Sequence, residues 1–171
     1  MEAQTSTKPI TEKELFIKMV VSNWELQNAR VNKLIAKLSD EQMNTPTAPG
    51  RNTGTWILGH LIAVNDGMIT LLGLGEKLYP ELEAAFTGEV NKPGVVAPAL
   101  AELKNQWNAL NAKLTEYFTA LPAEEWFTRH SAISPEDFAK EPHRNKLNIL
   151  INRTNHQSYH LGQLIYLDKK Q

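Results

Sequence analysis

Two histidines near the C-terminus, His156 and His160, have the spacing in this chain that most clearly suggests chemistry. Side chains at positions i and i+4 of a helix share one face, with Cβ atoms about 5–6 Å apart. Both rings can therefore bind one metal ion, each at about 2.0–2.1 Å. The pair predicts half of a metal site.

A third histidine, His60, lies in an apolar helical stretch far upstream. At about 100° per residue, its neighbours within a third of a turn are apolar, so His60 is predicted to face the core. On the C-terminal helix, His156 and His160 lie at a margin of the apolar arc, as expected for a cleft between helices. Buried unpaired polar groups cost about 1–3 kcal/mol each, and one divalent ion would satisfy all three rings. We therefore predict His60, His156 and His160 as metal ligands, while a packing role for His60 stays open.

Three neutral imidazoles suit zinc or nickel, with cobalt or iron as alternatives, and leave a position for water or substrate. Such a metal lowers the pKa of a bound water or thiol. Gln157 stands where the general base of a His-Glu-x-x-His protease would be, so protease activity is disfavoured. Four nearby polar residues could orient the rings or simply lie on the helix surface: Asn152, Asn155, Tyr159 and Gln163.

Other candidate residues are weaker. His130 and His143 lie in a proline-broken segment without a partner at ligand spacing, and are expected to be exposed loop residues. Ser158 is flanked by histidines of its own helix, a geometry that does not make a nucleophile and base pair. Asp66 is predicted to point away from the face of His60, so it is not a candidate base.

The elements that must position these residues are predicted to be helices. Thr11 and Glu14 fit a capping box that opens a helix reaching about residue 38, and a short helical turn follows at 39–42. The expected core-facing stripe of the first long helix is Leu15, Phe16, Met19, Val20, Leu26, Leu34 and Leu38. Thr53 or Thr55 could cap a second helix that carries His60 and ends near residues 73–75.

A long connection over 76–97 separates the second helix from a third, whose apolar positions recur at threes and fours from Leu100 to Leu121. A fourth helix over about 145–168 carries His156 and His160. No segment alternates with period two for long enough to form a strand. The expected fold is therefore all-α, a four-helix bundle forming a single domain over 1–171 with its core at about 11–168.

Composition limits the classes of partner. The chain has 171 residues, 18 Lys and Arg against 19 Asp and Glu, and no cysteine. Balanced charge without a basic cluster makes nucleic acid an unexpected partner. Without cysteine, any metal must be held by His, Asp or Glu. The N-terminal residues have no apolar leader and no long apolar run follows, which predicts a cytoplasmic protein without membrane association.

The chain resembles the DinB/YfiT-like superfamily of metal-binding four-helix bundles over roughly residues 11–168. Two segments carry the resemblance, Trp56-Ile-Leu-Gly-His60-Leu and His156-Gln-Ser-Tyr-His160-Leu-Gly-Gln163. The resemblance implies an up-down-down-up bundle with a long second connection, often a homodimer, with nickel or zinc held by His60, His156 and His160. Some members are thiol S-transferases or isomerases that use low-molecular-weight thiols such as bacillithiol or mycothiol, and many have no known activity.

The chain departs from the family pattern at two positions. An acidic residue commonly follows the first histidine of the pair and a basic residue the second, where this chain has Gln157 and Leu161. If those charges bind substrate or partner in relatives, these roles do not carry over.

Three functions follow as hypotheses. The first is a metal-dependent enzyme that transfers a small thiol onto an electrophile. The second is a catalytically silent, dimeric metal-binding or stress-associated bundle. The third is metal-assisted hydrolysis of a small amide or ester, which the lack of an Asp or Glu beside the ligands disfavours.

Overall fold

The computed structural model of the chain describes residues 9–88 and 96–168, and all its regular elements are helical. Four helices are long: α1 (Glu12–Lys37), α3 (Gly54–Leu71), α5 (Leu100–Ala120) and α7 (Lys146–Leu164). Five elements are short: α2 (Asp40–Met43), α4 (Leu82–Phe86), η1 (Glu125–Phe127), α6 (Pro135–Lys140) and η2 (Ile165–Leu167). The described residues form no strand, which confirms the all-α class.

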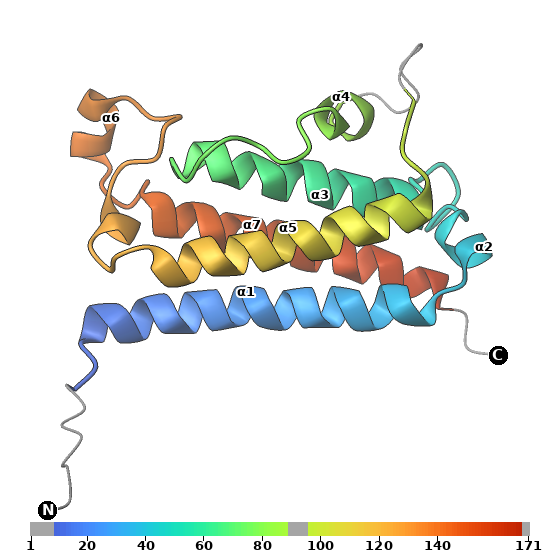
Figure 1. Cartoon of the computed structure of the whole chain (residues 1–171), viewed down its shortest axis with the longest axis horizontal. Helices are drawn as coiled ribbons and strands as arrows, with labels where there is room; N and C mark the ends of the chain where they lie inside the picture. The colour runs from blue at the N-terminus through green and yellow to red at the C-terminus, as the bar shows by residue number, and fades with distance from the viewer. Residues whose placement is uncertain (1–8, 89–95, 169–171) are drawn as a thin grey trace, which may run out of the picture.

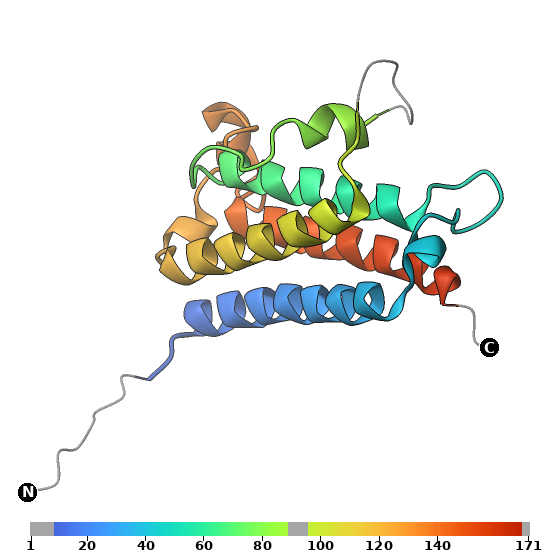
Figure 2. The ribbon, with the colours of Figure 1, turned by 45° about the vertical axis from the view of Figure 1, so that its right-hand side comes forward.

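The four long helices lie alongside one another (Figures 1 and 2). In Figure 1, α1 and α7 run from left to right, whereas α3 and α5 run from right to left. Ion pairs agree with these directions. Lys37 at the end of α1 bonds Asp168 just after η2 at 2.6 Å, and Lys13 at the start of α1 bonds Glu124 beyond the end of α5. The ligand-bearing helices α3 and α7 are therefore antiparallel neighbours, as the contact of Gly54 with Leu167 also requires.

Local sequence signals fix where the helices begin. The Thr11 hydroxyl accepts a hydrogen bond from the backbone N–H of Glu14, whose side chain accepts one from Thr11 in return. Ser39 and Gln42 make the same reciprocal pair at α2. Thr53 caps α3 by accepting from the N–H of Trp56. These caps satisfy the amides that the first turn of each helix leaves unpaired, and they set the register of the helix that carries His60.

The core-facing stripe predicted for α1 is wrong at four of its positions. Between 47% and 61% of each of four apolar side chains is exposed: Leu15, Phe16, Met19 and Leu26. The buried residues of α1 are Trp24, Gln27, Asn28, Val31 and Ile35. The prediction was wrong because the buried face includes the amide side chains of Gln27 and Asn28. A pattern of apolar residues assigns such polar side chains to the solvent-facing side.

A buried amide network explains why α1 turns this polar face inward. Gln157 of α7 is fully buried, accepts a hydrogen bond from Asn65 Nδ2 at 3.1 Å and donates one to Asn28 Oδ1 at 2.7 Å. Because buried polar groups without partners are costly, this network favours one register for α1, α3 and α7. Gln157 therefore points into the core, away from any ligand in the cleft.

The prediction that His130 is an exposed loop residue is wrong, because only 7% of its surface is accessible. Its Nδ1 accepts a hydrogen bond from the N–H of Ala132, and burial followed by the charges of Arg144 and Arg129 lowers its pKa. The proline-broken segment packs onto the ends of the helices instead of extending into solvent. His143 is exposed, as expected.

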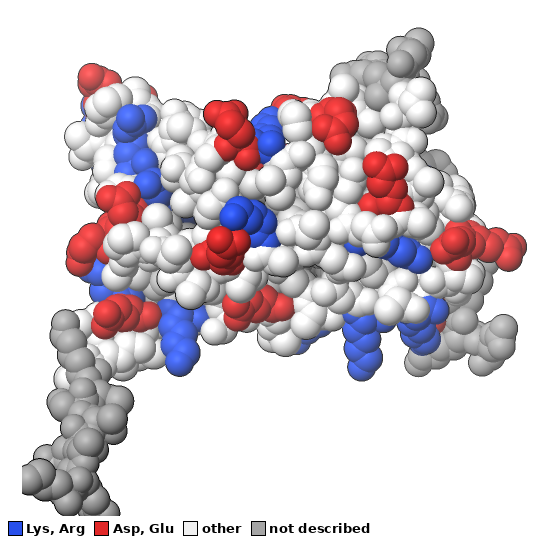
Figure 3. Space-filling view, in the orientation of Figure 1, with Lys and Arg blue, Asp and Glu red and all other residues white. Residues whose placement is uncertain are grey.

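The surface carries both signs of charge. Figure 3 shows basic and acidic side chains interspersed over the face in view, so this face has no continuous patch of one charge. None of the described helices has the length and apolar character needed to span a membrane.

Candidate metal centre

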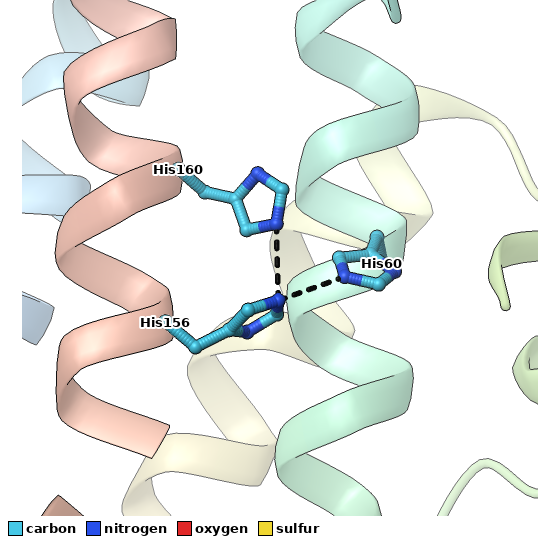
Figure 4. A group of neighbouring side chains, drawn as sticks. All are labelled: His60, His156 and His160. Atoms are coloured by element: carbon cyan, nitrogen blue, oxygen red, sulfur yellow. Dashed lines mark hydrogen bonds between the residues drawn. The ribbon is translucent and has the colours of Figure 1, made fainter. Parts of the chain in front are cut away.

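The three predicted ligands meet between α3 and α7. His60 projects from the middle of α3, and His156 and His160 project from successive turns of α7 (Figure 4). His156 Nε2 lies 3.2 Å from His60 Nε2 and 3.1 Å from His160 Nε2. The three ligand atoms all lie within 4.8 Å of one another, and they form the cluster of metal-ligating side chains found among the described residues. The structure thus brings together residues separated by about a hundred positions in sequence.

The separations of these nitrogens match the size of a metal ion. Two nitrogens bound at about 2.0–2.1 Å in tetrahedral directions lie about 3.3–3.4 Å apart. The observed 3.1 and 3.2 Å are within a few tenths of an ångström of that spacing. Only small ring movements would therefore be needed to bind zinc or another divalent transition metal.

Hydrogen bonds to the far nitrogens orient two of the rings. His60 Nδ1 lies 2.8 Å from the backbone oxygen of Phe86, and His160 Nδ1 lies 2.7 Å from Gln163 Oε1. Both partners are carbonyl oxygens and can only accept, so each Nδ1 carries the hydrogen and each Nε2 presents a lone pair to the cluster. This arrangement, in which a carbonyl fixes the tautomer of a ligand histidine, is common at metal sites.

His156 cannot satisfy both neighbouring rings by itself. A neutral imidazole has one N–H, so its Nε2 can donate to one of His60 and His160 while facing the lone pair of the other. Its Nδ1 is buried and has no hydrogen-bond partner among the described residues. A cation bound to all three Nε2 atoms would remove this conflict, and we take the conflict as the strongest sign that the cluster could hold a metal.

The electrostatics of the cluster favour neutral rings. Burial, followed by the charges of His160, His60 and Arg153, lowers the pKa of His156 to about 4. Burial also lowers the pKa of His160, although its hydrogen bond to Gln163 acts in the opposite direction. Metal binding requires neutral imidazole, so both shifts keep the ligands ready at neutral pH.

A glycine and an aromatic side chain hold His60 in place. The Phe86 ring lies against α3 where a Cβ at Gly59 would come within 2.5 Å of it, so glycine is needed beside the ligand. The Trp56 ring stacks on His60 with centroids 5.1 Å apart and an interplanar angle of 9°. Helix α4, through Phe86, therefore both packs on α3 and supplies the carbonyl that orients His60.

One side of the cluster opens into a pocket of about 260 Å³. Its lining includes His60, His160, Trp56, Tyr159, Gln163 and Arg51. The Tyr159 ring lies edge-on to His160, and its hydroxyl accepts a hydrogen bond from Gln163 Nε2 at 3.2 Å. A small molecule can therefore approach the ligand atoms from this side.

The other polar candidates divide into residues that contact the cluster and residues that do not. Of the four suggested orienting residues, Gln163 bonds a ligand ring and Tyr159 bonds Gln163, whereas Asn152 and Asn155 are exposed. Asp66 is buried and accepts the backbone N–H groups of two loop residues after α3, so it anchors that loop and is not a base for the cluster. The Ser158 hydroxyl donates to the Thr154 carbonyl and has no base beside it.

A family model described as the DinB superfamily matches residues 23–164, most of the chain, and this span includes all three histidines. The chain belongs to the DinB superfamily. The search of curated proteins gave no match. Membership in the DinB superfamily agrees with the helical fold and with a histidine cluster that could bind a metal ion.

Three features of the site were not predicted from the sequence. The carbonyl that orients His60 belongs to the backbone of Phe86, so no residue type in the sequence indicates it. The stacking of Trp56 on His60 could have been anticipated from their i, i+4 spacing. Arg153 lies one turn before His156, and its charge acts on that histidine. The angle of about 100° per residue that placed the histidines would also have placed Arg153 on the ligand-bearing face.

Proposed function

We propose that this DinB-superfamily protein is a metal-dependent enzyme that transfers a small thiol onto an electrophilic carbon. His60, His156 and His160 would hold the ion, with nickel or zinc as the metals best suited to three imidazoles. The observation that carries the proposal is the convergence of three Nε2 atoms beside an accessible pocket. A site of purely structural metal would more often be closed by a fourth protein ligand.

A divalent ion held by these three neutral rings would act as a Lewis acid and would lower the pKa of a group bound at the position left over. The protein's own residues do the rest. Phe86 and Gln163 hold the rings of His60 and His160 in orientation. In the reaction, the thiol loses its proton to solvent, sulfur bonds the electrophilic carbon, and the leaving group departs with the electron pair of its bond.

The absence of a carboxylate beside the ligands favours a thiol over water as the nucleophile. Among the described residues, no Asp or Glu bonds any of the three rings, and Gln157 faces the core. Water has a pKa near 15.7 and metal hydrolases generally add a base, whereas a thiol has a pKa near 8.5 and needs far less assistance. Hydrolysis of an amide or ester is therefore the weaker proposal.

We also propose that the protein pairs with a second copy of itself in the cytoplasm, where small thiols are kept reduced. The exposed apolar side chains of α1, Phe16 and Met19 among them, border a hollow of about 300 Å³ between α1 and α7. A surface that has both protruding apolar groups and a hollow can pair with its own copy about a two-fold axis. Exposed apolar patches of this kind commonly mark interfaces.

Sedimentation would test the pairing. Met19→Glu should convert a dimer to a monomer, whereas Asn105→Glu, on the exposed side of α5, should leave the dimer intact. A wild-type monomer at about 100 µM, or a dimer unaffected by Met19→Glu, would contradict this interface.

The activity is tested with metal-loaded protein, a small thiol and an alkyl or aryl halide, by following release of halide. We expect wild-type rates at least about 100-fold above those of His156→Ala, because loss of a group that only orients a ligand already costs about 10–100-fold. His143→Ala, which removes an exposed histidine outside the site, is the matched control and should keep the wild-type rate. Equal rates for the wild type and His156→Ala, at full metal content in the wild type, would favour a silent bundle.

A further inference from the structure

Arg153 occupies the ligand-bearing face of α7. It lies three residues before His156, about 60° around the helix from it and about 20° from His160. Residues three apart are neighbours on one helix face, and the charge of Arg153 is among the causes that lower the pKa of His156. The Cα atoms of Arg153 and His156 are about one helical turn apart, or about 5 Å along the axis of α7.

Arg153 has no acidic partner. It makes no hydrogen bond or ion pair with any other described residue, and its half-buried side chain has a buried Nε without an acceptor. Helix α7 contains no Asp or Glu at all. The single acid of α3, Asp66, already accepts two backbone N–H groups. Burial lowers the pKa of the guanidinium.

The unpaired positive charge of Arg153 next to a metal site suggests that the ligand bound there is an anion. A divalent ion at the histidine cluster would add two positive charges beside Arg153, with no carboxylate of the described residues at the cluster to offset them. Partly buried like charges repel strongly, so the loaded site would be stabilised by a ligand that brings negative charge. A guanidinium offers parallel N–H groups that match the two oxygens of a carboxylate.

We propose that Arg153 binds the carboxylate of the substrate whose other end occupies the open position at the histidine cluster. The inference rests on the proposed function and narrows its substrate class to small thiols that carry a carboxylate a few bonds from sulfur. A single guanidinium matches a monoanion, which favours a carboxylate over a phosphate dianion. Arg153 then selects the substrate and sets its orientation, while the histidines hold the ion.

The test is calorimetric binding of two thiols to protein whose metal content has first been measured. Mercaptoacetate carries the carboxylate, and 2-mercaptoethanol is a neutral thiol of similar size. We expect wild-type protein to bind mercaptoacetate at least about ten-fold more tightly than 2-mercaptoethanol, as for one charge-assisted hydrogen-bonded pair. In Arg153→Met this preference should fall below about three-fold, with affinity for 2-mercaptoethanol unchanged.

Arg30 of α1 supplies the matched control, because it is exposed, lies outside the site and makes no ion pair with the described residues. Arg30→Met should keep the preference for mercaptoacetate. Arg51 lines the pocket on the His160 side and is the competing candidate for the carboxylate. If Arg51→Met abolishes the preference while Arg153→Met retains it, the carboxylate lies in the pocket and the assignment to Arg153 is wrong. If Arg153→Met does not fold, the comparison of the two thiols on wild-type protein still decides whether the site selects an anion.

The outcomes separate this inference from the proposed function. Metal-loaded protein that binds both thiols equally overturns the role of Arg153 and leaves thiol transfer intact. Metal-loaded protein that binds neither thiol overturns the proposed function, and the inference with it. Protein that takes up no metal overturns both at the first measurement.

Discussion

Replacing Gly59 by alanine tests how packing outside the cluster controls the metal ligands. A Cβ at this position would lie 2.5 Å from Cε1 and Cζ of the Phe86 ring. Carbon atoms in contact lie about 3.5–4.0 Å apart, so the ring has to move by about 1 Å. Phe86 is only 2% exposed, which leaves its ring little freedom to rotate away. We expect the backbone of α4 to move with it.

The displacement should be transmitted to His60. The Phe86 carbonyl lies 2.8 Å from His60 Nδ1, and a shift of about 1 Å away would stretch this contact to about 3.8 Å, beyond hydrogen-bonding range. Loss of a hydrogen bond that orients a ligand histidine typically weakens metal binding by about 10–100-fold. Overpacking costs about 1–3 kcal/mol, and the better helix propensity of alanine offsets about 0.5–1 kcal/mol. The metal-free variant should therefore be less stable by up to about 2.5 kcal/mol.

Gly67→Ala is the matched control, because a Cβ at Gly67 of the same helix meets no atom within 4 Å. It should stabilise the metal-free protein by about 0.5–1 kcal/mol and leave metal affinity unchanged. Thermal unfolding of the chelator-treated proteins and competitive metal titration measure the two effects separately. If Gly59→Ala matches Gly67→Ala in both stability and affinity, the proposed link from Phe86 to His60 is wrong.

Three further predictions concern the network, the orientation of His160 and pH. Gln157→Leu leaves two buried amides without their partner and should lower the free energy of unfolding by about 2–4 kcal/mol in urea titrations; a loss below about 0.5 kcal/mol would show the network to be dispensable. Gln163→Ala removes the acceptor of His160 Nδ1 and should weaken metal binding by about 10–100-fold, whereas unchanged affinity would mean that this bond does not orient the ring. Because the pKa of His156 is lowered to about 4, protons compete with the metal at this ring only well below the usual histidine range. Metal content should therefore persist as pH falls through 6 and decline as it approaches 4, and half-loss at pH 6.5 would contradict the lowered pKa.

The sequence predicted those parts of the fold that depend on neighbours along the chain. The caps at Thr11, Ser39 and Thr53 are contacts between residues three apart, so residue types alone indicate them. The facing directions of His60, His156 and His160 also follow from helical geometry within each helix. That the three rings meet depended on the pairing of α3 with α7. The cost of burying three unpaired rings predicted this meeting, and the resemblance to a known family supported it.

The sequence pattern did not predict contacts between segments that are far apart in the chain. The buried face of α1 was predicted wrongly because Asn28 lies inside, where its partner Gln157 is 129 positions away in sequence. His130 was predicted to be exposed because nothing in a proline-broken segment shows how it folds back on the helices. Arg153 was overlooked for a different reason: its significance is the absence of an acidic partner, which only the surrounding structure can reveal.

The most direct test of the three-histidine site is the metal content of the purified protein, measured by elemental analysis after equilibration with a limiting mixture of divalent ions and removal of the excess. The wild type and His143→Ala should each retain about one equivalent per chain, and His60→Ala and His156→Ala each less than about a tenth, because two ligands hold such ions far more weakly than three. Wild-type protein with less than about a tenth of an equivalent, or a content unchanged by either ligand substitution, would contradict the assignment.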